Sequence, residues 1–183
     1  MRTSHHRQVN DNSTVVRLLL VWRRLMSYQE LDHAAYMRKA IAQAQVAPVA
    51  LFQSLIVDRE TGDVLASGAN DIVNDHPLVH GETDAIDHCW RAHRNIDWSR
   101  LALYTTAEPC PMCQAAIGWA GISLVVYGVS TPFLASLGFH TFDLRAEEVA
   151  ARNTFSRCEI IGGVLQHECE TLFREWVALN RPL

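Results

Sequence analysis

The chain has 183 residues, of which 49% are hydrophobic and 20% are charged, and its formal net charge at pH 7 is −4. This composition is close to that of an average globular domain, which argues against a disordered chain and against a fibrous repeat. The five cysteines are an odd number in a chain of this length. They argue against a secreted, disulfide-linked module and favour a reducing compartment, which we interpret as the cytoplasm.

Positive charge is concentrated at the N-terminus. Residues 1–25 contain five arginines and a single acidic residue, Asp11, so residues 26–183 carry a net charge of −8. We interpret residues 1–25 as a basic, poorly ordered extension and residues 26–183 as one domain. The apolar run Leu18–Trp22 is too short for a secretory or membrane-spanning segment. An acidic domain also lacks the clustered Lys and Arg that bind a polyanion, so neither a membrane nor a long nucleic acid is an expected partner.

The hydrophobic periodicity predicts an α/β domain. Ser27 and Glu30 match a capping box and predict a helix that continues to Gln45. Apolar runs at 51–58 and 64–67, joined by a polar turn, predict a hairpin. The later elements, in chain order, are expected as a helix at 81–94, a strand at 101–106, a helix at 110–120, a strand at 122–129, a weaker strand at 158–161 and a helix at 165–179. Strands that alternate with helices imply parallel neighbours joined by crossovers.

Two short motifs carry the residues best suited to chemistry. They are His80-Gly81-Glu82 and Pro109-Cys110-Pro111-Met112-Cys113, and each precedes or opens a predicted helix. Cysteines three apart on a first helical turn share one face, and the helix N-terminus favours their thiolates. One imidazole and two thiolates suit Zn²⁺, and three protein ligands leave the fourth position for water, as in catalytic sites. Glu82 lies two residues beyond His80, close enough to exchange protons with that water.

Two other interpretations of these motifs remain open at this point. Cys-x-x-Cys at a helix start is also typical of redox proteins. A purely structural zinc site would need a fourth protein ligand, for which His76, His88 and Cys89 are the candidates.

The two motifs resemble the zinc signature H-x-E…P-C-x-x-C of the cytidine deaminase-like superfamily. The chain is similar to its bacterial branch of guanine and nucleoside deaminases and tRNA adenosine deaminases. The similarity covers about residues 28–180 and includes Gly68–Asn70, Leu103–Glu108 and Ala116–Ala120. The resemblance implies a three-layer α/β/α fold, whose central mixed five-stranded sheet has an N-terminal antiparallel hairpin and otherwise parallel strands. It also implies a helix between the last two strands.

The resemblance further implies a hydrolytic, zinc-dependent deaminase. Such an enzyme replaces an exocyclic amine by oxygen on a small purine-like nucleobase, nucleoside or related heterocycle and releases ammonia. One Zn²⁺ per chain would be held by His80, Cys110 and Cys113, and Glu82 would carry protons between the water, the ring and the amine. The residues that would contact substrate are Asn70, the backbone of Ala107, Trp119 and His140. Assembly as a homodimer follows from the family alone.

Three positions depart from close relatives in the family. Gly81 stands where alanine is more usual and is expected to add backbone freedom, and Gln53 stands where a small residue is common. His140 and Thr141 follow Gly-Phe where guanine deaminases tend to carry acidic residues, which makes guanine a doubtful substrate. His140 is interpreted either as a pocket residue or as a solvated loop residue.

Two further function classes remain. The first is a tRNA adenosine deaminase, which the absence of a basic C-terminal tail disfavours. The second is a non-catalytic zinc scaffold, which has no need for Glu82.

Overall fold

The computed structural model describes residues 30–47, 50–71 and 76–180. The predicted extension over residues 1–25 and Ser27 lie outside these residues. The first described helix, α2 (His33–Val46), begins later than the capping box at Ser27 and Glu30 predicts. Asp32 caps it instead, because its Oδ1 accepts a hydrogen bond from the Ala35 N–H at 2.9 Å.

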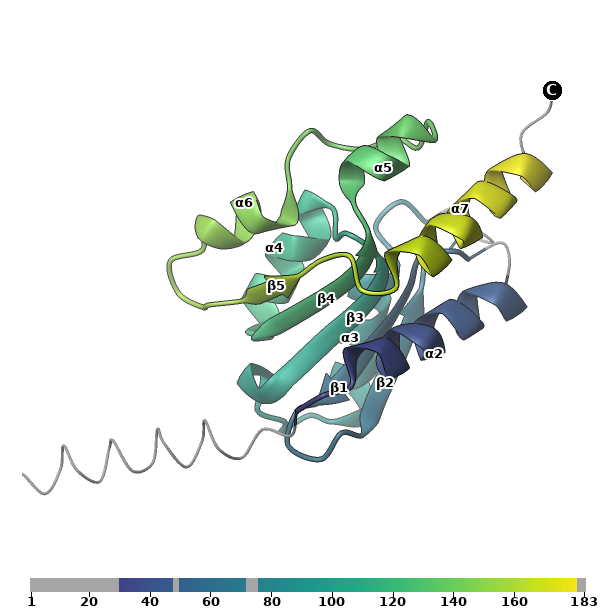
Figure 1. Cartoon of the computed structure of the whole chain (residues 1–183). Coiled ribbons are helices and arrows are strands. Elements are labelled where there is room, and N and C mark those ends of the chain that lie inside the picture. Colours follow the sequence, from purple (N-terminus) through teal and green to yellow (C-terminus); the bar gives the residue numbers. More distant parts are fainter. Residues whose placement is uncertain (1–29, 48–49, 72–75, 181–183) are drawn as a thin grey trace, which may run out of the picture. The chain divides into compact units, whose positions relative to one another are not determined.

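Five strands form one mixed sheet in the order β2-β1-β3-β4-β5 (Figure 1). They are β1 (Gln53–Asp58), β2 (Val64–Ala69), β3 (Leu101–Ala107), β4 (Leu124–Val129) and β5 (Glu159–Ile161). Strand β1 pairs antiparallel with both β2 and β3, whereas β3 with β4 and β4 with β5 are parallel pairs. Strands β2, β3, β4 and β5 therefore run in one direction. This confirms the predicted mixed sheet and its N-terminal hairpin.

Helices cover both faces of the sheet and complete three layers (Figure 1). Helices α2 and α7 (Gln166–Asn180) pack on the face that presents Tyr104 and Val126. Helices α3 (Gly81–Ala92) and α4 (Pro111–Ala120) pack on the face that presents Leu103 and Val125. Because side chains alternate between the faces of a strand, a continuous apolar run such as 101–104 supplies both cores.

The crossover between β4 and β5 contains two short helices where one helix was expected. Helix α5 (Thr131–Ser136) is capped by the Ser130 hydroxyl, and Gly138 with φ 79° follows its end. Helix α6 (Ala146–Ala151) begins where Glu148 accepts a hydrogen bond from the Arg145 N–H at 3.0 Å. A single-turn 3₁₀ helix, η1 (Trp98–Arg100), precedes β3. Within the described residues, every helix is too short or too polar to cross a membrane.

Candidate active site

Two helix starts meet at one edge of the sheet. Helix α3 follows β2 and has His80 as its N-cap, and α4 follows β3 and has Cys110 as its N-cap with Pro111 next to it. Because β2 and β3 run in the same direction, both helices begin beside the same ends of the strands. Proline suits a first helical position because the backbone N–H it lacks would have no partner there. The topology therefore brings together residues that are about 30 positions apart in the sequence.

The three predicted metal ligands form one group. The ligand atoms of His80, Cys110 and Cys113 lie within 4.8 Å of one another. The Nδ1 atom of His80 is 3.6 Å from the Cys110 Sγ and 3.5 Å from the Cys113 Sγ. A tetrahedral zinc ion with usual Zn–N and Zn–S bond lengths requires an N-to-S separation of about 3.5 Å. The donor set and its spacing fit one Zn²⁺ per chain.

The electrostatics of the group also suit a cation. The hydrogen bond with the Cys113 thiol lowers the pKa of Cys110 to about 4, despite its burial, and His80 adds to this shift. This lowered pKa favours the thiolate form of Cys110, which is the form that binds zinc. The pKa of Cys113 is raised, first by its hydrogen bond with Cys110 and then by burial, so zinc must displace a proton from this thiol.

The alternative interpretations of the motifs find no support in the described residues. The candidate fourth ligands His76, His88 and Cys89 are not part of the His80 group. His88 contacts the Ser67 carbonyl at 2.8 Å, and Cys89 is fully buried in the core on the α3 side. All five cysteines are free, so Cys110 and Cys113 are not joined to each other. A three-ligand site is what a catalytic zinc ion needs.

Glu82 lies on the first turn of α3 and is 5% exposed. The Thr105 hydroxyl lies 3.5 Å from its Oε1 and can donate to it. Burial raises the pKa of Glu82, and the negative charge of Cys110 adds to this effect. A buried carboxyl with a raised pKa is suited to accept and return a proton near neutral pH.

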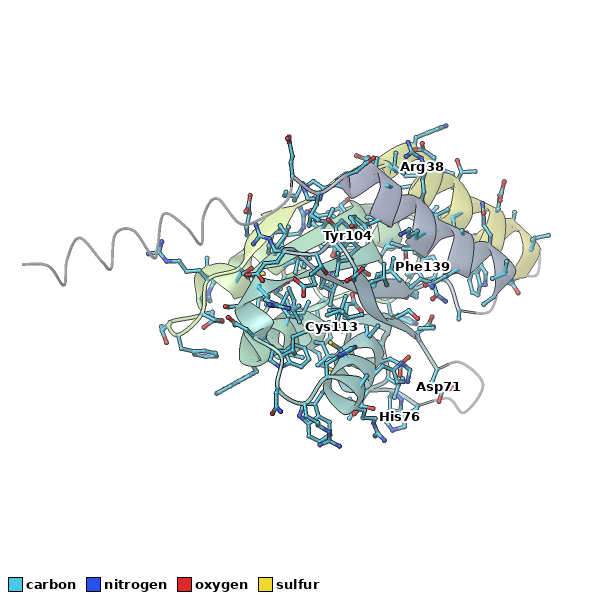
Figure 2. All side chains as sticks on the ribbon, turned by 90° about the horizontal axis from the view of Figure 1, so that it is seen from below. Arg38, Asp71, His76, Tyr104, Cys113 and Phe139 are labelled. Carbon is cyan, nitrogen blue, oxygen red and sulfur yellow. The ribbon has the colours of Figure 1, made fainter. Side chains whose placement is uncertain are left out.

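A pocket of about 380 Å³ opens beside the ligand group and Glu82. Its lining combines three phenylalanine rings with a larger number of polar and charged side chains. Phe52 and Phe139 meet edge to face at 5.8 Å between ring centroids. Figure 2 shows Asp71 and His76, which also line the pocket, on the loop after β2, with Cys113 deeper in the molecule.

The structure places two of the four predicted substrate residues in this pocket. Asn70 and His140 line it. Ala107 ends β3, is 1% exposed and is not among the lining residues. Trp119 lies outside the pocket: it is 77% exposed and stacks on Phe155 at 4.7 Å. Its spacing of six residues from Cys113 places it about 120° around α4 from that ligand, which a helical wheel could have shown.

Several pocket residues lacked a usable sequence signal. Phe52, Thr131, Phe139 and Phe142 line the pocket, and each lies on a loop or an element end. Glu108 also lines the pocket. It ends the stretch Leu103–Glu108 on which the family resemblance rests, but its role depends on partners far along the chain.

The structure gives a packing reason for glycine at position 81. A Cβ at this position would lie 2.4 Å from the Phe52 carbonyl oxygen, so alanine requires a backbone shift. Gln53, the second position that departs from relatives, is buried, and its Nε2 donates a hydrogen bond to the Ala50 carbonyl at 2.7 Å. It does not line the pocket.

Comparison with known proteins agrees with this site. Residues 30–129 match the cytidine and deoxycytidylate deaminase zinc-binding region, and the chain belongs to this family. It is a hydrolytic, zinc-dependent deaminase, with His80, Cys110 and Cys113 in place for one zinc ion.

Its curated relatives act on different substrates. The chain is 35% identical to a probable cytosine deaminase of Schizosaccharomyces pombe, over 61% of this chain and 70% of the relative. It is 30% identical to the tRNA-specific adenosine deaminase of Rickettsia bellii, over 75% and 94%, respectively. It is also 30% identical to the guanine deaminase of Bacillus subtilis, over 60% and 72%.

A solved structure of guanine deaminase from Nitrosomonas europaea has the same fold, with a TM-score of 0.72 at 21% identity. The match covers 97% of this chain and 98% of that one.

Proposed function

We propose that this deaminase acts on a small purine-like nucleobase, nucleoside or related heterocycle, replacing an exocyclic amine by oxygen and releasing ammonia. The observation that carries this proposal is the pocket of about 380 Å³, which ends at Glu82 and the His80 group. Its volume and its two edge-to-face phenylalanine rings suit a flat aromatic ring. The substrates named for the relatives in fission yeast and Bacillus subtilis, cytosine and guanine, are free bases of this class.

The roles of the site residues follow from their positions. His80, Cys110 and Cys113 hold the zinc, which when bound supplies an activated water at neutral pH. Glu82 accepts one proton of the attacking water at a carboxylate oxygen and delivers it to the ring nitrogen. It then accepts the second proton, from the oxygen now bonded to the ring carbon, and delivers it to the amine, which leaves as ammonia. Its burial keeps competing bulk water away from this transfer.

Asn70 and His140 are proposed to orient the ring. The Asn70 Oδ1 accepts a hydrogen bond from the Phe52 N–H at 3.3 Å, which turns the side-chain NH₂ toward the substrate as a donor. His140 lies on the exposed rim of the same pocket, where it contacts the ring edge remote from the amine.

Adenosine in tRNA and guanine are the alternative substrates. The Rickettsia bellii relative, which this chain covers over 94% of its length, favours the first. The net charge of −8 over residues 26–183 disfavours it, because phosphate contacts dominate the affinity for RNA. Guanine is disfavoured by His140 and Thr141 where acidic residues are usual.

The experiment is an ammonia-release screen over nucleobases, nucleosides, pterins and triazines, with a tRNA gel shift in parallel. We expect turnover of one small-molecule class, no tRNA shift, and one zinc ion per chain. The Glu82→Gln variant should keep its zinc and lose turnover by at least ~10²-fold, because general acid–base transfer contributes that much. Turnover by Glu82→Gln at the wild-type rate would refute the role of Glu82, and activity on tRNA alone would refute the small-molecule substrate.

The cellular compartment and the oligomeric state of the enzyme are also proposals. Five free cysteines support a reducing compartment, which we infer to be the cytoplasm. We infer a homodimer from the family resemblance, and light scattering after size-exclusion chromatography tests it against a monomer.

A further inference from the structure

Glu108 is a buried carboxylate that borders the pocket but has no part in the proton transfers proposed above. It follows the last residue of β3 and precedes Cys110 by two positions. Its side chain is 0% exposed. A buried carboxylate is costly unless its oxygens are fully hydrogen-bonded, so its partners show what the fold gains from it.

The partners of Glu108 come from two places in the sequence. Its Oε2 accepts the Thr131 N–H at 2.8 Å, at the start of α5. Its Oε1 accepts the Ala146 N–H at 2.9 Å, at the start of α6. The Arg145 Nε donates to both oxygens, at 2.7 and 2.9 Å. One carboxylate therefore holds both ends of segment 131–146, which leaves β4 through α5 and returns through α6 (Figure 1).

Arg145 is itself held in place by a residue of the sheet. Its guanidinium donates to the Tyr127 hydroxyl at 3.1 Å, and that hydroxyl donates to Glu147 at 3.3 Å. Tyr127 lies on β4 and is 4% exposed. The Arg145 side chain is thus fixed at the carboxylate through Nε and at the phenol through Nη2, and these two attachments together orient the guanidinium.

The segment between these anchors forms one wall of the pocket. Phe139, His140, Thr141 and Phe142 all line it. The middle of segment 131–146 is fixed by Phe139. Its ring packs against Phe173 and Trp176 on α7, with ring centroids 5.8 and 5.6 Å apart, respectively. Phe139 appears among the labelled side chains of Figure 2, on the side of the sheet that carries α2 and α7.

From this geometry we infer that Glu108 is a positioning residue, which sets the distance between the metal-binding turn at Cys110 and the pocket wall at residues 139–142. This inference rests on the proposed function, because it concerns how that pocket holds its substrate. Loosening the wall removes contacts made equally in the ground state and the transition state. Such a loss raises KM and leaves kcat nearly unchanged.

The test compares Glu108→Gln with a matched control, Asp58→Asn. Glutamine keeps the shape of the side chain but replaces one accepting oxygen by an NH₂ group. That group faces N–H donors of Thr131, Ala146 or Arg145 and cannot accept their hydrogen bonds. Asp58 is also a buried carboxylate paired with an arginine, Arg100, but it lies at the opposite end of β3, where it pairs in register with Leu101. Both variants lose a buried ion pair, and only the first touches segment 131–146.

We expect Glu108→Gln to retain one zinc ion per chain, to raise KM roughly tenfold and to keep kcat within about threefold of wild type. Hydrogen exchange should become faster over residues 131–146 in this variant. Asp58→Asn should leave KM and the exchange of that segment unchanged. If Glu108→Gln does not fold, Arg145→Lys provides the test, because lysine keeps the charge but has one nitrogen in place of the two, Nε and Nη2, that donate to Glu108 and to the Tyr127 hydroxyl. It should show the same changes at smaller size.

Wild-type KM together with wild-type exchange over 131–146 in the variants would overturn the inference. So would equal changes in Glu108→Gln and Asp58→Asn, since the effect would then be general destabilisation. If the wild-type chain deaminates no compound in the screen, the proposed function fails. The exchange comparison still decides the positioning role in that case.

Discussion

The metal-binding turns and the pocket wall are built in different ways. His80, Cys110 and Cys113 are placed by local rules, because each lies on or next to the first turn of a helix that follows a strand. Segment 131–146 contains one six-residue helix, α5, and only the first residue of α6, and it is placed by distant partners, namely Glu108 and the aromatic residues of α7. Substitutions in the first region should therefore affect metal binding and turnover, and substitutions in the second should affect substrate affinity.

The largest expected effect comes from Cys113→Ser. The serine hydroxyl is a poor zinc ligand, so the variant should lose its zinc, and turnover should fall below detection. Inductively coupled plasma mass spectrometry measures the zinc. Cys158→Ser is the control, because Cys158 is also free but lies outside the ligand group, and it should keep one zinc ion. Zinc retained in Cys113→Ser would show that the metal is held elsewhere.

Gly81→Ala should have the next largest effect. Its Cβ would lie 2.4 Å from the Phe52 carbonyl oxygen, so the start of α3 must move, with His80 and Glu82 on it. We expect the free energy of unfolding to fall by about 1–3 kcal/mol, as for overpacked sites, together with lower turnover. Urea denaturation measures the free energy of unfolding, and ammonia release measures turnover.

Gly118→Ala provides the comparison for this prediction. Gly118 is also helical, but its added Cβ would meet a side-chain atom, Nδ2 of Asn153, at 2.7 Å, so that relief requires the loss of the Asn153–Ser156 side-chain hydrogen bond and not a shift of backbone. It should cost less stability than Gly81→Ala. Equal losses in the two variants would mean that the contact with Phe52 is not the constraint on α3.

His140→Ala tests the pocket wall directly. His140 lines the pocket yet is exposed, so its removal should change stability by less than about 0.5 kcal/mol. We expect KM to rise roughly threefold to tenfold at constant kcat, because a contact remote from the amine contributes uniform binding. Steady-state kinetics of ammonia release measure both constants. An unchanged KM would identify His140 as a solvated loop residue.

Trp119→Ala should have the smallest kinetic effect. Trp119 is 77% exposed and lies outside the pocket, so KM and kcat should remain within about twofold of wild type. The same kinetic assay measures them. A rise in KM without loss of stability would instead place this ring against the substrate.

The sequence was informative where structure depends on neighbouring residues. The helix predicted at 110–120, with both cysteines on its first turn, agrees with α4, and the apolar runs predicted all five strands to within a few residues. The prediction differed at the start of α2, which Asp32 caps, whereas the predicted cap Ser27 lies outside the described residues. The position of Glu108 could not be derived, because its partners Thr131 and Ala146 lie 23 and 38 residues away.

The two-ended attachment of segment 131–146 has a consequence for engineering substrate choice. A loop from another deaminase could be grafted between Thr131 and Ala146 as a cassette, provided that it keeps a backbone N–H at its first position and an arginine just before its last. Libraries that randomise residues 140–142 but retain these two attachment points should therefore yield folded enzymes more often than libraries that randomise position 145.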